Sequence, residues 1–309
     1  MRLVKRIDMY NLFKPQILLI IMRVRYSFGS RHTGHLDNIT KQKEKFPKLV
    51  RDIVRISDIL LEVLDSRFIE ESRNEDFEKL IKEQGKKIIY ILNKSDLVDK
   101  EKVRKQITEN HPEIFPFVFV SCKNRSGSRE IRNRIKIEVS KLEKKKDGGK
   151  FDRAQVGIIG YPNTGKSSLI NLITGKSAAR VGAESGFTKG MQKISLTKSI
   201  LILDTPGVIP ESEYSHSKTS AIQKQSKLGA RTLDKIRDPE LMVIGLMKEY
   251  SKQIEDFYQV TANNDSDLLI QEIGKKFNFM KKGGTIDEDR VSRVIIRDWQ
   301  EGKIKTGNI

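Results

Sequence analysis

The feature that most restricts the fold is the sequence GYPNTGKS at residues 160–167, which fits the pattern GxxxxGK[ST]. It follows an apolar stretch at 155–159 and precedes a helical pattern that begins at Lys166. A glycine-rich turn between a strand and a helix lets backbone N–H groups surround a phosphate at the helix N-terminus. We expect Lys166 to contact the β- and γ-phosphates of a nucleotide and the Ser167 hydroxyl to bind Mg²⁺. The other contacts of this phosphate loop are expected from Gly160, Asn163, Thr164, Gly165 and Ser168.

A second phosphate-binding segment is predicted where the apolar residues 200–203 run into DTPG at 204–207. An apolar strand that ends in an aspartate is typical of the second half of such a site. Asp204 would hold Mg²⁺ through water, and the N–H of Gly207 would contact the γ-phosphate.

Between these two segments lies GFTKG at residues 186–190, a glycine-flanked threonine. Thr188 can close over Mg²⁺ and the γ-phosphate from a mobile loop, although it also fits an ordinary loop threonine. The residues expected to act on the reacting phosphate are therefore Lys166, Thr188 and Gly207, with Ser167, Thr188 and Asp204 as the metal ligands.

The base specificity is predicted from NKSD at residues 93–96, which ends the apolar stretch 87–92. The carboxylate of Asp96 can accept hydrogen bonds from guanine N1–H and N2–H, groups that adenine lacks, and burying it unpaired against adenine would be costly. Asn93 would fix the loop, and the Lys94 stem would cover the ring. Asp96 therefore argues against an ATP-using enzyme and in favour of GTP and GDP.

A further contact with the base is expected from SCK at residues 121–123, after the apolar stretch 117–120. The backbone N–H of Cys122 would donate to guanine O6, and the neighbouring residues Ser121 and Lys123 would complete the loop. The triplet alone says little, and its spacing from Asp96 is what favours this role.

Short β-branched stretches alternate with helical patterns, which predicts an α/β fold with a parallel-rich sheet of about six strands flanked by helices. The expected strands are 58–64, 87–92, 117–120, 155–159, 193–197 and 200–203, and the expected helices are 76–84, 100–110, 128–145 and 166–173. The order of the motifs is unusual, because base recognition precedes the phosphate loop. Rotating the order restores one complete site, and the charged, glycine-containing segment 141–150 suits a join between former termini.

We predict three regions: an N-terminal tail at 1–30, a circularly permuted nucleotide-binding domain at 31–214 and a basic, mostly helical domain at 215–309. In the last region, apolar residues recur at helical spacing. Its basic residues fit either a solvated helix surface or contact with nucleic acid, and they are Lys275, Lys276, Lys281, Lys282, Arg290, Arg293 and Arg297. The formal charge of the whole chain, +18, favours a polyanionic partner.

Composition excludes several classes of protein. The chain has one cysteine, Cys122, which excludes an internal disulfide framework and indicates a reducing, cytoplasmic location. Its four histidines are too scattered for a metal cluster. The longest apolar run, at 17–22, is far shorter than the roughly 20 residues of a membrane span, so we expect no stable membrane association.

Together these motifs resemble the circularly permuted GTPases of the YlqF/YawG type, in the TRAFAC class. The resemblance covers about residues 31–303, and it includes VLDSR at 63–67 with RN at 73–74, KKGG at 281–284 and RDWQEGK at 297–303. It implies a GTP-hydrolysing factor that binds rRNA and the large ribosomal subunit precursor, assists assembly, and is monomeric away from the ribosome.

The resemblance implies a role in hydrolysis for each of three positions. Val208 stands where Ras-like enzymes have a water-orienting glutamine, which implies slow intrinsic hydrolysis that ribosomal particles stimulate. His35, in TGHL at 33–36, is similar to the family's Pro-Gly-His-Met histidine and would assist catalysis. Asn163 resembles the asparagine that accompanies K⁺ activation in related enzymes. Two alternatives stay open: a nucleotide-sensing RNA-binding module with negligible hydrolysis, and a GTPase acting on tRNA or a membrane surface.

Overall fold

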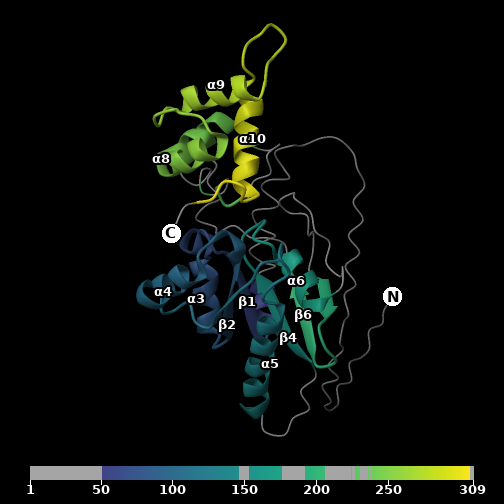
Figure 1. The fold of residues 1–309 in the computed structure, drawn as a ribbon. Helices are drawn as coiled ribbons and strands as arrows, with labels where there is room; N and C mark the ends of the chain where they lie inside the picture. The colour runs from purple at the N-terminus through teal and green to yellow at the C-terminus, as the bar shows by residue number, and fades with distance from the viewer. Residues whose placement is uncertain are drawn as a thin grey trace, which may run out of the picture.

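The computed structural model describes residues 51–145, 153–175, 192–205, 224, 227–229, 236 and 238–306. Two bodies are visible in Figure 1, a sheet flanked by helices and a smaller group of helices above it. The boundary that we predict near residue 215 lies outside the described residues.

The centre of the larger body is a six-stranded sheet with the order β3-β2-β1-β4-β6-β5. All neighbouring strands run parallel except β5 and β6, which pair antiparallel. The strands are β1 (Ile59–Asp65), β2 (Lys87–Asn93), β3 (Phe117–Phe119), β4 (Ala154–Ile159), β5 (Gln192–Ser195) and β6 (Ile200–Asp204). The predicted parallel-rich α/β fold is therefore confirmed, with each expected strand in place.

Both faces of the sheet are buried, because its strands alternate between two apolar clusters. On β1, Ile59, Leu61 and Val63 face one cluster, whereas Leu60 and Leu64 face the other. Helices α5 (Ser128–Lys145) and α6 (Lys166–Thr174) cover the first face, and α3 (Glu75–Glu83) and α4 (Lys100–Asn110) cover the second. These four helices match the predicted ranges, whereas the short α2 (Ile69–Ser72) was not predicted.

Among the described residues, the smaller body contains three helices, α8 (Pro239–Tyr258), α9 (Ser266–Lys276) and α10 (Glu288–Gln300). Aspartate side chains cap two of them, since Asp265 accepts from the N–H groups of residues 267 and 268 and Asp287 accepts from that of residue 290. The helices share an apolar core around the fully buried Trp299. Phe68 and Tyr161, which come from the sheet body, also belong to this core.

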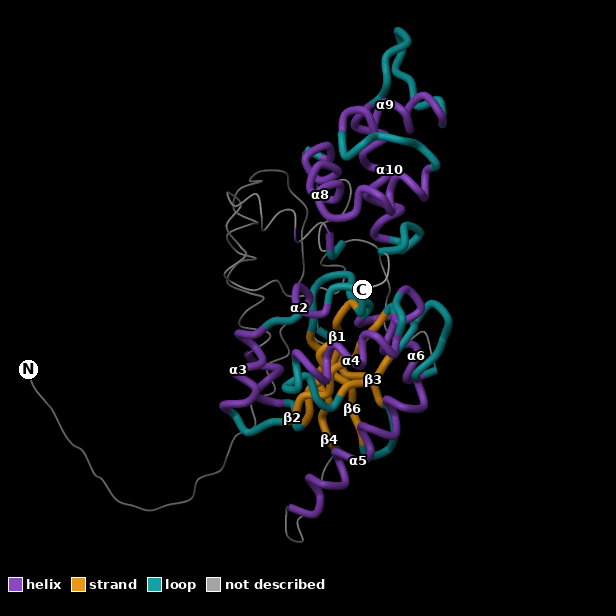
Figure 2. The backbone as a smooth tube through the Cα atoms, turned by 60° about the vertical axis from the view of Figure 1, so that its left-hand side comes forward, coloured by secondary structure: helices purple, strands orange, loops and turns teal. Residues whose placement is uncertain are grey.

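The two bodies meet at one edge of the sheet. Because β1, β2, β3, β4 and β6 run parallel, their carboxyl ends all lie at this edge. Figure 2 shows α8 and α10 beyond it, and Arg67, two residues after β1, donates through Nη1 to the carbonyl oxygen of Trp299 at 3.0 Å. In open α/β sheets, ligands bind outside the carboxyl ends of the strands. The helical body therefore borders the edge where a ligand is expected.

Candidate functional site

The phosphate loop connects the end of β4 to the start of α6 and needs glycine at two places. Gly160 and Gly165 have φ values of +145° and +100°. A Cβ on Gly160 would lie 2.6 Å from the carbonyl oxygen of Val63, and one on Gly165 would overlap the Asn93 side chain. Lys166 closes the loop from inside, because its Nζ donates to the carbonyl oxygens of Gly160 at 3.0 Å and Tyr161 at 2.5 Å. The loop is thus shaped by its own glycines and by Lys166.

Lys166 and Asp204 form a buried pair of opposite charges at this loop. Burial lowers the pKa of Lys166 to about 8, and the nearby Asp204 partly offsets that effect. Burial also raises the pKa of Asp204 to about 6, against the opposing influence of Lys166. Neither charge is fully compensated by its partner, so an anionic phosphate and a cation would each stabilise the ionised forms.

Asp204 also fits the predicted magnesium site. Its Oδ1 is buried and accepts no hydrogen bond from the part of the chain that the structure describes. Ser167 and Ser168 lie half-buried in the first turn of α6, where a hydroxyl can reach a cation beside a bound phosphate. Carboxylate and hydroxyl oxygens are the donors that Mg²⁺ prefers, and the ion usually keeps several of its waters. The residues present therefore suit a Mg²⁺ ion held partly through water.

The base-recognition segment 93–97, called the guanine loop below, follows β2 and ends in the 3₁₀ turn Ser95–Leu97. Lys94 adopts the left-handed conformation, with φ of +60°. Asp96 is exposed, and its Oδ1 accepts a hydrogen bond from Ser121 Oγ at 2.5 Å. The Asp96 carboxylate is held at one oxygen, as a group that accepts from a guanine edge must be.

One side chain joins the two halves of the site. The amide of Asn93 donates through Nδ2 to the carbonyl oxygen of Thr164 at 2.7 Å, although the two residues are 71 positions apart. Its Oδ1 accepts from the backbone N–H of Cys122 at 3.3 Å. The phosphate loop, the guanine loop and the segment 121–123 therefore lie together, as expected from rotating the motif order.

Cys122 and Lys123 lie beside the guanine loop. The Cys122 N–H, which we expect to donate to guanine O6, donates in this structure to Asn93, and the bond is long for an N–H···O contact. Burial raises the pKa of the Cys122 thiol to about 12, so the thiol is neutral. Lys123 is exposed. The predicted contacts of these residues with guanine stay predictions.

Sequence reasoning missed a buried ionic cluster beneath the guanine loop. The Lys94 Nζ lies 2.8 Å from Asp65 Oδ2. Arg67 holds the same carboxylate with two bonds, from Nε to Oδ1 at 3.0 Å and from Nη2 to Oδ2 at 2.9 Å. Burial alone would raise the pKa of Asp65, but Lys94 and Arg67 outweigh it and lower that pKa well below its usual range. Asp65 and Arg67 belong to the VLDSR segment noted in the sequence, but their contact with Lys94 had no local signal.

The phosphate loop also contacts the helical body, which the sequence did not predict. Tyr161 is fully buried in the helical core. The side chain of Asn163 donates through Nδ2 to the carbonyl oxygen of Gly229 at 2.6 Å. Asn163, expected beside a monovalent cation, thus reaches the segment that leads into α8.

Several predicted residues fall outside the described part of the chain: His35, Thr188, Gly207 and Val208. Their roles stay predictions. Elsewhere, Thr164 Oγ1 donates to the carbonyl oxygen of Tyr161 at 2.9 Å and so supports the phosphate loop.

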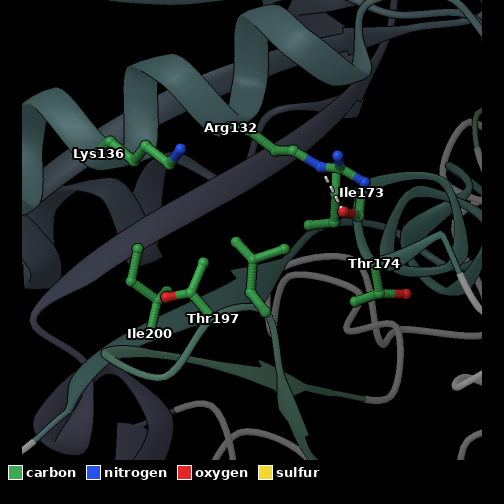
Figure 3. Close-up of a pocket in the computed structure, with 7 residues that line it drawn as sticks. Arg132, Lys136, Ile173, Thr174, Thr197 and Ile200 are labelled. Atoms are coloured by element: carbon green, nitrogen blue, oxygen red, sulfur yellow. Dashed lines mark hydrogen bonds between the residues drawn. The ribbon is translucent and has the colours of Figure 1, made fainter.

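A separate hollow of about 230 Å³ lies between α5, α6 and the turn before β6. Figure 3 shows Arg132 and Lys136 on one side of it and Thr197 and Ile200 on the other. It lies near the start of β6 and the end of α6, so it is remote from the phosphate loop, and Arg132 Nε already donates to the carbonyl oxygen of Ile173 at 2.6 Å. The hollow is not part of the candidate site.

Comparison with known proteins identifies the family. The sequence profile of the family described as "50S ribosome-binding GTPase" matches residues 155–275. An uncharacterized GTP-binding protein of Methanocaldococcus jannaschii is 37% identical over 269 residues, which cover 85% of this chain and 67% of that protein. The chain belongs to the circularly permuted, YlqF-type GTP-binding proteins. It is therefore a GTP-binding protein of a GTPase family, and guanine nucleotides are its ligands.

Eukaryotic relatives and solved structures agree with this assignment. Nucleolar GTP-binding protein 2 of Saccharomyces cerevisiae is 31% identical over 82% of this chain and 50% of that protein. The chain thus spans about half the length of this relative. The fold matches GNP-bound YlqF from T. maritima with a TM-score of 0.58 and 24% identity, covering 85% of this chain and 96% of that one. The YlqF-type fold therefore extends over both bodies.

Proposed function

We propose that this protein hydrolyses GTP slowly with Mg²⁺ and binds the RNA of a large ribosomal subunit precursor, whose assembly it assists. The description of the matched family supports a ribosomal partner, and one relative is named as a nucleolar protein. The site supports the chemistry, because a glycine-containing phosphate loop, a buried lysine and a buried carboxylate lie at one sheet edge. GTP binding would prepare the protein for the RNA, and hydrolysis would release it.

The observation that carries RNA binding is a surface of the helical body that is both aromatic and cationic. We call it the 277–290 surface, and it consists of Phe277, Met280, Lys281, Lys282 and Arg290. The side chains of Phe277 and Met280 are 47% and 42% exposed. Unpaired RNA bases stack on exposed aromatic rings, and nearby cations neutralise the phosphates.

Ion pairing separates the basic residues of the helical body into two groups. Lys275 and Arg293 are paired, since Lys275 Nζ lies 2.9 Å from Glu272 and Arg293 Nε lies 2.7 Å from Asp289. Lys281 and Lys282 are exposed, and within the described ranges no carboxylate lies within ion-pair distance of either side chain. An unpaired lysine releases counterions when it meets a phosphate without first breaking an internal ion pair. These two lysines are therefore the best placed for RNA.

Arg290 adds a planar cation to the same surface. Its guanidinium lies 4.7 Å from the ring centroid of Phe279, and Phe279 stacks against Phe277 with 6.1 Å between centroids and 19° between planes. The two nearly parallel rings and the Arg290 guanidinium thus form a row next to the two lysines, in which Phe277 and Arg290 are exposed and Phe279 is half-buried. Such a row suits an unpaired stretch of RNA better than the closed surface of a duplex.

Replacing both lysines tests this proposal. The double variant Lys281→Glu/Lys282→Glu should bind purified large-subunit precursors at least about tenfold more weakly, and its salt dependence should be shallower by roughly one to two phosphate contacts. The matched control, Lys102→Glu/Lys105→Glu on α4, makes the same charge change on two exposed lysines of the sheet body. Equal affinity of the double variant and the wild type would contradict the proposal, as would an equal loss in both double variants.

Turnover separates the enzyme from a module that only senses nucleotide. GTP hydrolysis should be slow for the isolated protein and should rise when large-subunit precursors are added. No rise above background with the particles, at concentrations where binding is complete, would favour the binding module. Among the described residues, no helix has the length and apolarity that crossing a bilayer requires.

A further inference from the structure

The carboxyl end of α10 lies against the guanine loop. Gly302, two residues after α10 ends, has φ of +71° and sits directly beside Leu97. A Cβ at Gly302 would overlap Leu97 Cδ1 and lie 3.0 Å from Leu97 Cδ2. Leu97 immediately follows Asp96, the carboxylate expected to contact guanine. The packing at Gly302 therefore limits where Asp96 can lie.

A second contact holds the other end of the guanine loop. The carbonyl oxygen of Trp299 accepts from Arg67 Nη1 at 3.0 Å, and Arg67 in turn holds Asp65 with two bonds. Asp65 holds the Nζ of Lys94 at 2.8 Å. The side chains of Arg67 and Asp65 are both 1% exposed, so this connection is almost free of solvent screening.

We propose that residues 299–302 form a latch that positions the guanine loop for the base without contacting the nucleotide. The latch holds Lys94 through Arg67 and Asp65, and it holds Asp96 through Leu97. This inference rests on the proposed guanine contact of Asp96. Gly302, Trp299 and Arg67 are positioning residues in this account, whereas the phosphate loop meets the helical body separately, through Tyr161 and Asn163.

The latch couples two binding events. If seating the end of α10 improves guanine binding, bound guanine nucleotide must stabilise the seated helical body by the same factor. A partner that draws the helical body away from the sheet would then weaken the hold on the base first. The phosphate loop would lose its contacts through Tyr161 and Asn163 but keep its own glycine turn and the bonds from Lys166 Nζ, so we expect the phosphate contacts to weaken less.

The variant Gly302→Ala tests the latch, because the added methyl group displaces Leu97. Leucine is flexible enough to move, so we expect the protein to fold. We expect GDP to bind at least about fivefold more weakly, in the range typical of coupling between sites. The ratio of GDP to inosine diphosphate affinity should also fall, since inosine lacks the N2 amino group and gains less from a well-placed carboxylate. A loss that is merely structural would weaken both nucleotides equally and leave the ratio unchanged.

Gly85→Ala is the matched control. Gly85 has φ of +65°, close to that of Gly302, but a Cβ there meets no atom within 4 Å. It should therefore incur the same backbone strain and leave both dissociation constants within about twofold of wild type. Adding Leu97→Ala to Gly302→Ala removes the displaced atoms, so the glycine substitution should cost little in a Leu97→Ala background. Thermal unfolding of each variant reports any loss of folded protein.

Three outcomes overturn the latch: Gly302→Ala matches Gly85→Ala in both affinities, the affinity ratio stays at the wild-type value, or the two effects at Gly302 and Leu97 simply add. Each would be measured on a wild-type protein that binds GDP, so it would leave the proposed function standing. If the wild type showed no preference for GDP over inosine diphosphate, the guanine contact of Asp96 would itself be wrong.

Discussion

The phosphate loop and the guanine loop lie at one edge of the same sheet, but their shapes have different origins. The phosphate loop is built locally, by glycines at 160 and 165 and by a lysine that bonds to its own loop. The guanine loop depends on distant residues, because Asp65 and Arg67 hold one end and Gly302 packs against the other. The difference teaches that the turn of the phosphate loop is set by its own residues, whereas the position of the guanine loop follows from packing against the end of α10.

Removing Arg67, which supports the guanine loop through Asp65, should have the largest effect on the stability of the protein. Arg67→Met leaves the buried Asp65 with Lys94 as its remaining cation and removes the bond to Trp299, so we expect the free energy of unfolding to fall by about 3 kcal/mol. Urea denaturation measures this loss. Arg104→Met, which removes an exposed arginine paired with Glu101, should change it by less than about 0.5 kcal/mol. Equal losses in the two variants would show that the buried cluster stabilises the protein no more than an exposed ion pair does.

Changing Asp96 should alter base choice and spare the phosphate side. Asp96→Asn should weaken GTP binding by about 100-fold, because the amide presents a donor to the guanine N1–H or N2–H, and it should favour xanthosine triphosphate, whose O2 is an acceptor. Competition binding with GTP, xanthosine triphosphate and ATP measures both effects. An unchanged order of preference would contradict the assignment of Asp96. ATP is the internal control, because its weak binding should be the same in the variant and the wild type.

Glu62, a second carboxyl group on β1, tests whether the guanine loop responds to Asp65 in particular or to any change in this strand. Burial, with help from Glu78, raises the pKa of Glu62 to about 8. A group whose pKa is raised by folding stabilises the folded state below its unfolded pKa and loses that contribution as pH rises toward the folded value. Wild-type stability should therefore fall by roughly 2 kcal/mol between pH 6 and 8 through this group, and Glu62→Gln should reduce that fall.

The bond of Glu62 stays within the sheet body, because its Oε1 accepts from the N–H of Asn74. We therefore expect Glu62→Gln to leave the affinity for GDP unchanged. Denaturation at several pH values and GDP titration measure the two properties separately. A weakened affinity for GDP would mean that the guanine loop responds to any change in β1.

The smallest effect is expected at the phosphate loop's contact with Gly229. Asn163→Ala removes the bond from Nδ2, which should lower the free energy of unfolding by about 1 kcal/mol. Asn278→Ala is matched to it, because both residues have positive φ, of +60° and +54°, and no hydrogen bond of the Asn278 side chain is among those of the described residues. The difference between the two variants reports what the Asn163 side chain contributes beyond the backbone effect of a positive φ. A difference near zero would show that the bond to Gly229 adds nothing to the packing of Tyr161 in the helical core.

The sequence predicted the features that are built locally, as the phosphate loop is, and missed the contacts between distant residues that hold the guanine loop. The strands, the helices over the sheet and the phosphate loop follow from local signals, such as apolar stretches of regular length and glycines before Lys166. Rotating the motif order also brought Asn93 to Thr164 correctly. The contacts of Arg67 with Trp299 and of Leu97 with Gly302 span more than 200 residues and have no periodic pattern, so no local reasoning finds them. Glu62, within the apolar run of β1, was a visible signal of a buried carboxyl group.

Hydrogen exchange with and without GDP tests the coupling of the two bodies most directly. The N–H groups of Gly302 and Lys303 donate to the carbonyl oxygens of Trp299 and Asp298, so their exchange reports whether the end of α10 is in place. We expect GDP to slow exchange at residues 299–304 together with residues 93–97. Slower exchange confined to the loops at 93–97 and 160–168, with the end of α10 unchanged, would contradict the coupling.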